Sequence, residues 1–154
     1  MALMKEVNEK VYKIIGSCME VHKALGPGYP EDFYKRALEI EFPLKGLEFD
    51  ARKSIQVIFK QQQVGSLEID FLVAKDVVVM VRSQEGLKDI EIQQVLRCLS
   101  LTEATIGVLV NFGLVKIQYK RILPSYQQRD VQKPGYRIPG SREIGRTREG
   151  NPVI

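Results

Sequence analysis

The chain has 154 residues, 44% of them hydrophobic, which is enough for one globular domain with its own core. No apolar run approaches the about 20 residues that span a bilayer. The start, Met1-Ala2-Leu3-Met4 followed by Lys5 and Glu6, lacks the apolar segment of a signal peptide, so we expect a cytoplasmic protein. The formal net charge is +4. Residues 115–154 contain nine Lys and Arg but only three Asp and Glu. This charge distribution favours an acidic partner, either nucleic acid or protein.

The two cysteines, Cys18 and Cys98, each lie within an apolar helical pattern. In such places a free cysteine behaves as a small hydrophobic residue. Two cysteines this far apart have no metal-ligand spacing and do not indicate a disulfide framework. We therefore expect both to be buried thiols.

Two amphipathic helices are predicted at the start of the chain. The first runs from about Lys5 to Leu25, where Gly26-Pro27-Gly28 stops it. Its predicted apolar side is Val7, Val11, Ile14, Ile15, Cys18, Met19, His22 and Leu25. The second begins near Pro30 and ends or kinks near Phe42, because the following Pro43 has no amide donor. Its predicted buried stripe is Phe33, Ala37, Ile40 and Leu44.

Three antiparallel strands are expected next. Ile55, Val57 and Phe59 alternate with polar neighbours in the first strand, and Gln61-Gln62-Gln63 is predicted to be the turn after it. The run from Leu67 to Arg82 is predicted to be a hairpin with its turn at Ala74-Lys75-Asp76. Strict alternation would place Leu67, Ile69, Phe71 and Val73 on one face and Glu68, Asp70 and Leu72 on the other.

The second half of the predicted domain contains a helix and two strands. Asp89 can cap a helix that runs to about Thr102, with Gln94 among its apolar residues. Residues 105–112 are nearly all apolar, as in a strand that is buried on both faces. Residues 115–120 alternate and predict a half-exposed last strand.

The composition changes after Leu123. Residues 124–154 contain four prolines, four glycines and scattered arginines, with no apolar period. Such a segment cannot form its own core. We expect a domain of residues 1–123 followed by a basic tail that is disordered alone or extended on a partner.

One segment resembles a known bacterial family, which takes its name from a Gly-x-x-Glu-x-x-Tyr motif. In this chain the motif is Gly28, Glu31 and Tyr34. The resemblance extends from about Val11 to Leu123 and includes the strand end Val110-Asn111-Phe112-Gly113.

That family is similar to the PD-(D/E)XK nuclease superfamily. The resemblance implies an α/β (α+β) fold with a restriction-endonuclease-like core, a central mixed sheet of four to five strands flanked by helices. It places the first catalytic acid on Glu31, the metal-binding Asp on Asp70, the Glu-x-Lys on Met80-Val81-Arg82, and a frequent helix Gln on Gln94. It also implies Mg²⁺ if the site is active.

Two of these positions depart from the superfamily pattern. Met80 offers a thioether, which hard Mg²⁺ does not select. Arg82 can bind a phosphate but stays protonated, so it cannot accept a proton from water. Losing one member of a catalytic unit commonly costs orders of magnitude in rate. We therefore expect no ordinary nuclease activity and no bound cofactor, with metal binding at Asp70 and Glu31 weak or lost.

Other interpretations of the same residues remain open. Asp70 and Arg82 can form a cross-strand ion pair, and Glu31 can serve as a first-turn acid that complements the helix dipole. His22, the only histidine, is expected to be structural. A carboxylate that has migrated into the site could restore activity, and the candidates are Glu68, Glu85 and Glu91.

Three functions are consistent with these features. The first is a catalytically inactive nuclease-like protein that serves as a scaffolding subunit of a larger protein complex. The second is a nucleic-acid-binding protein that does not cleave, and the third is a Mg²⁺-dependent nuclease with a migrated carboxylate. For a partner, the tail offers anchors spaced between charges: Tyr126, Arg129, Tyr136, Arg137, Arg142, Arg146 and Arg148.

Overall fold

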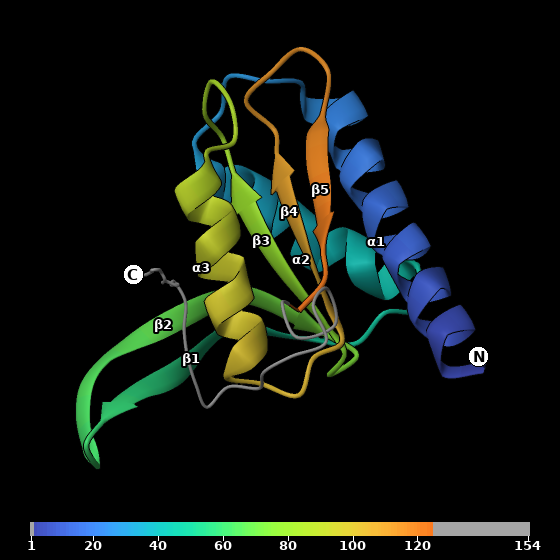
Figure 1. Ribbon diagram of the computed structural model, residues 1–154. Coiled ribbons are helices and arrows are strands. Elements are labelled where there is room, and N and C mark those ends of the chain that lie inside the picture. Colours follow the sequence, from blue (N-terminus) through green and yellow to red (C-terminus); the bar gives the residue numbers. More distant parts are fainter. Residues whose placement is uncertain (1, 125–154) are drawn as a thin grey trace. The chain divides into compact units, whose positions relative to one another are not determined.

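The structure is a computed structural model that describes residues 2–124 (Figure 1). The chain divides into two units, residues 1–122 and 123–154. All that follows concerns the first unit. Of the predicted tail, all but Pro124 lies outside the described residues, and so do its predicted partner-binding side chains.

The described residues form a mixed five-stranded sheet in the order β1-β2-β3-β4-β5. The strands are β1 (Phe49–Phe59), β2 (Gln62–Val73), β3 (Val77–Arg82), β4 (Ile106–Asn111) and β5 (Gln118–Ile122). Only β3 and β4 are parallel, and the other neighbours are antiparallel. The sheet therefore matches the predicted mixed sheet of four to five strands.

Helices cover both faces of this sheet (Figure 1). α1 (Ala2–Leu25) and α2 (Glu31–Leu44) lie on one face, and α3 (Asp89–Ser100) lies on the other. Each face has its own hydrophobic core. β4, with a helix layer on both sides, is buried along its whole length, as its apolar sequence predicts.

The apolar side of α1 is close to the predicted one. Val7, Val11, Ile14 and Cys18 are buried, as expected, and Val21 joins them. Three other predicted members differ: Met19 and Leu25 are exposed, and His22 is half-buried.

The buried stripe of α2 differs from the prediction. Phe33, Ile40 and Leu44 are 52%, 69% and 74% exposed. The fully buried residues are instead Tyr34, Leu38 and Phe42, and the predicted Ala37 is partly buried against the same core. The aromatic rings decide this orientation, because Tyr34 stacks on Phe112 at 4.6 Å and Phe42 meets Phe71 edge-on at 5.2 Å.

α2 also continues past Phe42. Pro43 lies in the last turn and the helix ends at Leu44. The amide of Lys45, which follows the helix, donates to the carbonyl oxygens of Glu41 and Phe42. A proline this close to the end removes only one intrahelical hydrogen bond. The helix therefore ends two residues later than predicted.

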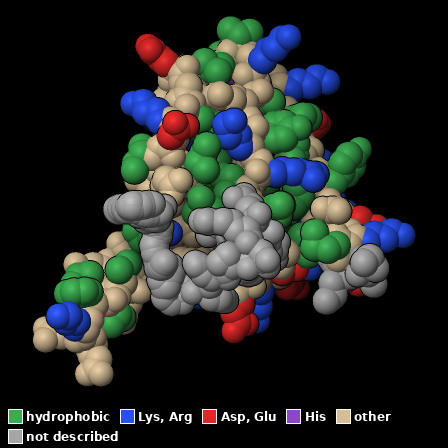
Figure 2. Space-filling model, in the orientation of Figure 1, with side chains coloured by type: hydrophobic (Ala, Val, Ile, Leu, Met, Phe, Trp, Pro, Cys, Tyr) green, Lys and Arg blue, Asp and Glu red, His purple; other side chains and the backbone are tan. Residues whose placement is uncertain are grey.

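β1 and β2 form a long arm that extends beyond the rest of the sheet (Figure 1). The β2–β3 ladder contains only residues 71–73, opposite 77–79, whereas β1 and β2 pair out to Phe59 and Gln62. On the face in view in Figure 2 the arm carries no acidic group, and between residues 52 and 67 the sequence has none. The arm begins at residue 49, earlier than the predicted start at Ile55.

The turn at the tip of the arm is not the predicted Gln61-Gln62-Gln63. It is Lys60-Gln61, with φ angles of 50° and 66°, and the second strand resumes at once at Gln62. Two consecutive residues with positive φ make the tight turn that fits a twisted two-stranded ribbon.

The predicted alternation in β2 is broken at Asp70. Ile69 packs on the α3 side of the sheet and Phe71 packs on the α1–α2 side. At this point β2 leaves β3, and Arg52, on the neighbouring strand, has a φ of 54°. The resulting bend in the ribbon changes the face on which the side chains lie.

The last strand is shifted from its prediction. β5 spans Gln118–Ile122, whereas the alternation suggested 115–120. Its pairing with β4 begins at Asn111 opposite Gln118, so the segment before Gln118 serves as the connection.

Candidate functional site

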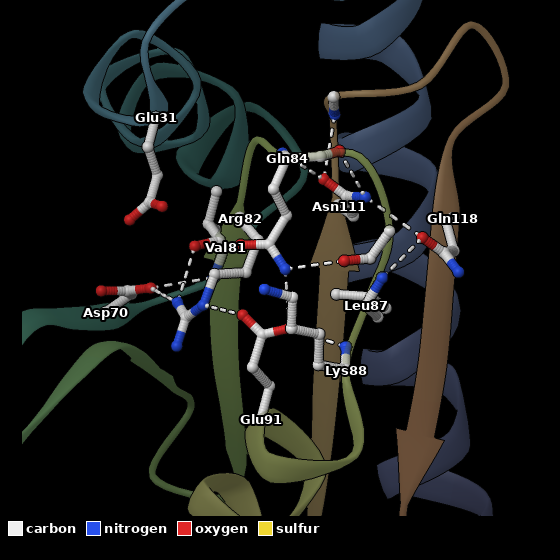
Figure 3. A network of polar contacts seen from close by, with 12 residues as sticks. Glu31, Asp70, Val81, Arg82, Gln84, Leu87, Lys88, Glu91, Asn111 and Gln118 are labelled. Carbon is white, nitrogen blue, oxygen red and sulfur yellow. Dashed lines mark hydrogen bonds and ion pairs between the residues drawn. The ribbon is translucent and has the colours of Figure 1, made fainter.

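Asp70 lies where β2 separates from β3 (Figure 3). Its side chain is 7% exposed. Oδ2 accepts a 2.8 Å hydrogen bond from the Val81 amide, so the carboxylate takes the place of a missing ladder partner. The local break in the sheet thus creates a fixed position for a buried negative charge.

Two residues of α2 face Asp70. Nζ of Lys35 lies 3.0 Å from Asp70 Oδ1 and 3.0 Å from Glu31 Oε2. Lys35 and Glu31 are one helical turn apart, which places them side by side on α2. Burial lowers the pKa of Lys35, but its hydrogen bonds to Glu31 and Asp70 and their charges together outweigh burial and raise it.

Arg82 approaches Asp70 from the end of β3 (Figure 3). Its Nη1 lies 3.6 Å from Asp70 Oδ2, which agrees with the predicted ion pair, and also donates to the Val81 carbonyl at 2.8 Å. Its Nε donates to Glu91 Oε2 at 2.9 Å. The guanidinium is therefore held between two carboxylates and is 17% exposed.

Glu91, in the first turn of α3, is the second anchor of Arg82. Its Oε1 accepts hydrogen bonds from Gln84 Nε2 at 2.7 Å and from the Lys88 amide at 2.9 Å. The second bond satisfies a free amide at the helix start. Lys88, not the predicted Asp89, is the residue at the N-cap.

A buried amide cluster supports the loop that connects β3 to α3 (Figure 3). Asn111 accepts from the amides of Gln84 and Gly113, and it donates to the Gln84 carbonyl and to Gln118 Oε1. The backbone of Gln84 lies against Gly113 so closely that a methyl group there would overlap it. The hydrogen bonds of Asn111 and the close contact with Gly113 together fix the loop from which the Gln84 side chain reaches Glu91.

The remaining predicted site residues lie elsewhere. Met80 is buried in the core on the α3 side, 6% exposed. Gln94 is exposed on α3, so it is not part of the apolar face on which the sequence placed it. Of the three candidate migrated carboxylates, Glu68 and Glu85 are exposed and only Glu91 belongs to the network.

The Gly-x-x-Glu-x-x-Tyr residues shape the start of α2. Gly28 has a φ of 111°, a conformation that side chains disfavour. The Tyr34 hydroxyl donates to the Gly26 carbonyl and accepts from the Tyr29 amide at 3.1 Å, which ties the preceding turn to the helix. His22 lies outside the motif. Its ring is hydrogen-bonded to the Leu114 carbonyl at 2.9 Å and lies 6.1 Å from the ring of Phe112, contacts that suit the predicted structural role.

The residues present do not fit a divalent metal. Within residues 2–124, no group of three or more His, Cys, Asp or Glu could hold one. Asp70 Oδ1 is bound to the Lys35 ammonium, and Oδ2 to the Val81 amide and Arg82. Both positions where a metal would meet this carboxylate are therefore taken by the protein's own cations and amide.

Residues 8–122 match a family model described as the PD-(D/E)XK nuclease superfamily. The chain belongs to that superfamily. The membership agrees with the fold, a mixed sheet flanked by helices, and confirms this level of the predicted resemblance. The narrower family with the Gly-x-x-Glu-x-x-Tyr motif stays a prediction.

Other comparisons add little to the superfamily assignment. No curated protein matches the chain. The crystal structure of SSO0001 is similar at 23% identity and a TM-score of 0.46, over 61% of this chain. The match spans half the length of that structure's chain. Within the described residues of this superfamily member, no helix is long and apolar enough to cross a membrane.

Proposed function

We propose that this PD-(D/E)XK domain is catalytically inactive and acts as a binding or scaffolding subunit of a larger protein complex. The observation that carries the proposal is the fixed position of Arg82 between Asp70 and Glu91. The resemblance predicts that Arg82 takes the position of the superfamily's lysine. Arg82 is part of an ion network with these two carboxylates, and its side chain is only 17% exposed.

The chemistry of this position supports inactivity. Phosphodiester hydrolysis needs a metal to polarise the phosphate and a group that orients or deprotonates water. A guanidinium binds phosphate but is not a proton acceptor for water. Met80, at the position of the Glu ligand, packs in the core on the α3 side. Neither requirement is met by the side chains at these two positions.

The assay for this proposal is cleavage of single-stranded DNA, duplex DNA and RNA with Mg²⁺ or Mn²⁺. We expect no cleavage by the unaltered chain. Metal-dependent cleavage that disappears in Asp70→Ala would refute the proposal. Activity that also requires Glu91, and not the exposed Glu68 or Glu85, would identify the nuclease with a migrated carboxylate. The double variant Met80→Glu with Arg82→Lys measures whether the scaffold still accepts the chemistry.

The scaffolding role is tested by purifying the tagged full-length chain from its native host. We expect a stoichiometric partner protein whose recovery depends on the tail residues Tyr126 and Tyr136. Serine at both positions should release the partner without changing the circular dichroism of the domain. A chain that elutes alone, at the mass of a monomer, contradicts the scaffolding role.

Nucleic-acid binding without cleavage is the alternative. Its proposed phosphate contact through Arg82 is disfavoured, because that guanidinium already binds two carboxylates. The basic tail remains for this function. Binding through the tail would weaken steeply as salt rises, and it would survive Arg82→Met.

A further inference from the structure

Lys35 lies between two carboxylates in the way that a bound metal ion does. Its Nζ is 3.0 Å from Glu31 Oε2 and 3.0 Å from Asp70 Oδ1. Glu31 Oε2 on α2 and Asp70 Oδ1 on β2 therefore contact the same cation. The separation of these two oxygens is at most twice the 3.0 Å that joins each of them to Nζ. A lysine ammonium is a compact charge, comparable in this respect to a small ion.

The charges of the network show what Lys35 contributes. Glu31, Asp70 and Glu91 supply three negative charges, and Lys35 and Arg82 supply two positive ones. If Lys35 lost its charge, one divalent ion together with Arg82 would balance the three carboxylates. With Lys35 in place, the same ion would leave an excess positive charge beside it.

We propose that Lys35 is a tethered cation which takes the place of a divalent metal between Glu31 and Asp70, and that its ammonium is what keeps such a metal out. This inference deepens the proposed function, on which it rests, because it identifies what makes the acidic site independent of metal. It concerns the cation on α2, whereas the proposed function is carried by Arg82 on β3, between Asp70 and Glu91.

The surroundings of Asp70 make the role of Lys35 specific. Oδ2 is already bound to the Val81 amide and faces Arg82, so Oδ1 is the oxygen that depends on Lys35. Asp70 is buried, and a buried carboxylate without a partner is costly. Glu31, at the outer side, is 37% exposed. An ion from solution thus has access to the position that Lys35 would leave.

The test is Mn²⁺ titration of the full-length Lys35→Gln variant by calorimetry, together with its melting temperature with and without Mn²⁺. We expect one Mn²⁺ per chain, bound at least about tenfold more tightly than by the unaltered chain, because the like charge between the two carboxylates is removed. Mn²⁺ should also raise the melting temperature. Adding Asp70→Asn to this variant should abolish both effects.

Two matched variants serve as controls. Lys35→Arg keeps the positive charge and should gain no Mn²⁺ binding. Lys45→Gln removes the lysine that directly follows the same helix. This lysine pairs with Glu41 at 3.3 Å in the same one-turn spacing, and its loss should produce no gain either. A gain in either control would show that the effect is not specific to a cation at the Lys35 position.

Three results overturn the inference: a folded Lys35→Gln variant without improved Mn²⁺ binding, a gain that Asp70→Asn does not remove, or tight Mn²⁺ binding by the unaltered chain. If Lys35→Gln does not fold without metal, the variant is refolded in the presence of Mn²⁺. Failure of Mn²⁺ to restore folding would then contradict the inference. Cleavage by the unaltered chain would refute the proposed function, whereas a failed gain in the variant refutes only the role of Lys35.

Discussion

Asp70 is held by three partners, which come from two different elements of the fold. Its two oxygens meet the Lys35 ammonium of α2 and, on β3, the Val81 amide and the Arg82 guanidinium. Asparagine at this position keeps an acceptor for the amide but removes the charge that balances the two cations. We expect Asp70→Asn to lower the free energy of unfolding by about 1–3 kcal/mol.

Urea unfolding at pH 7 measures this effect. The exposed Asp50, on the neighbouring strand, provides the control, because Asp50→Asn should change stability by less than about 0.5 kcal/mol. Equal stability of Asp70→Asn and the unaltered chain would mean that the ion network contributes nothing.

Lys35 makes stability depend on pH in the alkaline range. Its pKa in the folded protein is raised above the ordinary 10.5. Its contribution is therefore complete below pH 10.5 and is lost as the pH rises through the raised pKa. We expect the stability difference between the unaltered chain and Lys35→Gln to be constant from pH 7 to about pH 10 and to shrink above it. A difference that grows with pH would contradict this sign.

The two cysteines are expected to be unreactive in the folded protein. Both are buried and free. Burial raises the pKa of Cys18 to about 12, and burial together with the charge of Asp70 raises that of Cys98, an effect that Arg82 partly offsets. At pH 8 little thiolate forms. A thiol reagent such as DTNB should label neither residue until urea unfolds the chain, whereas rapid labelling of the native protein would contradict the packing.

At the level of elements, α2 shows what the sequence can and cannot predict. Apolar spacing correctly places a helix here, but the helix carries two apolar stripes. The one that packs inward contains Tyr34 and Phe42, which meet Phe112 and Phe71. That choice depends on contacts with distant strands, so spacing within the helix could not decide it.

The fit of α3 against β4 is a second property of paired elements. A methyl group at Gly107 would come within 2.5 Å of Val95 Cγ1 on α3. We expect Gly107→Ala to destabilise the protein by about 1–3 kcal/mol, because the core on this side is closely packed. Val95→Ala in the same chain should relieve part of this cost.

The helical Gly16 is the matched control, since a methyl group there meets nothing within 4 Å. Gly16→Ala should be neutral or stabilising by up to about 1 kcal/mol. Thermal and urea unfolding measure both variants. Strictly additive effects of Gly107→Ala and Val95→Ala would exclude the proposed contact.

At the scale of the molecule, the ion network joins α2, β2, β3 and α3. The resemblance led to Glu31, Asp70 and Arg82, and the structure brings all three together. It did not lead to Lys35 or Gln84, because neither belongs to the motif. The one-turn spacing of Glu31 and Lys35 is a local signal that could have suggested the first pair. Gln84 depends on the loop held by Asn111, which only the folded chain reveals.

The break in the alternation of β2 at Asp70 also could not be predicted from the sequence. Period-two alternation assumes a regular strand, whereas β2 bends where it leaves β3. The order of elements followed from apolar periodicity, and the mixed sheet was implied by the resemblance; the structure confirms both.

If the protein's own cations close this acidic site, the unaltered full-length chain should not bind Mn²⁺. Electron paramagnetic resonance reports the free ion directly. The protein is used at about 0.1 mM, in excess over Mn²⁺, because sites of moderate affinity bind at this concentration. We predict the full signal of free Mn²⁺. A loss of that signal which Asp70→Asn restores would contradict the account.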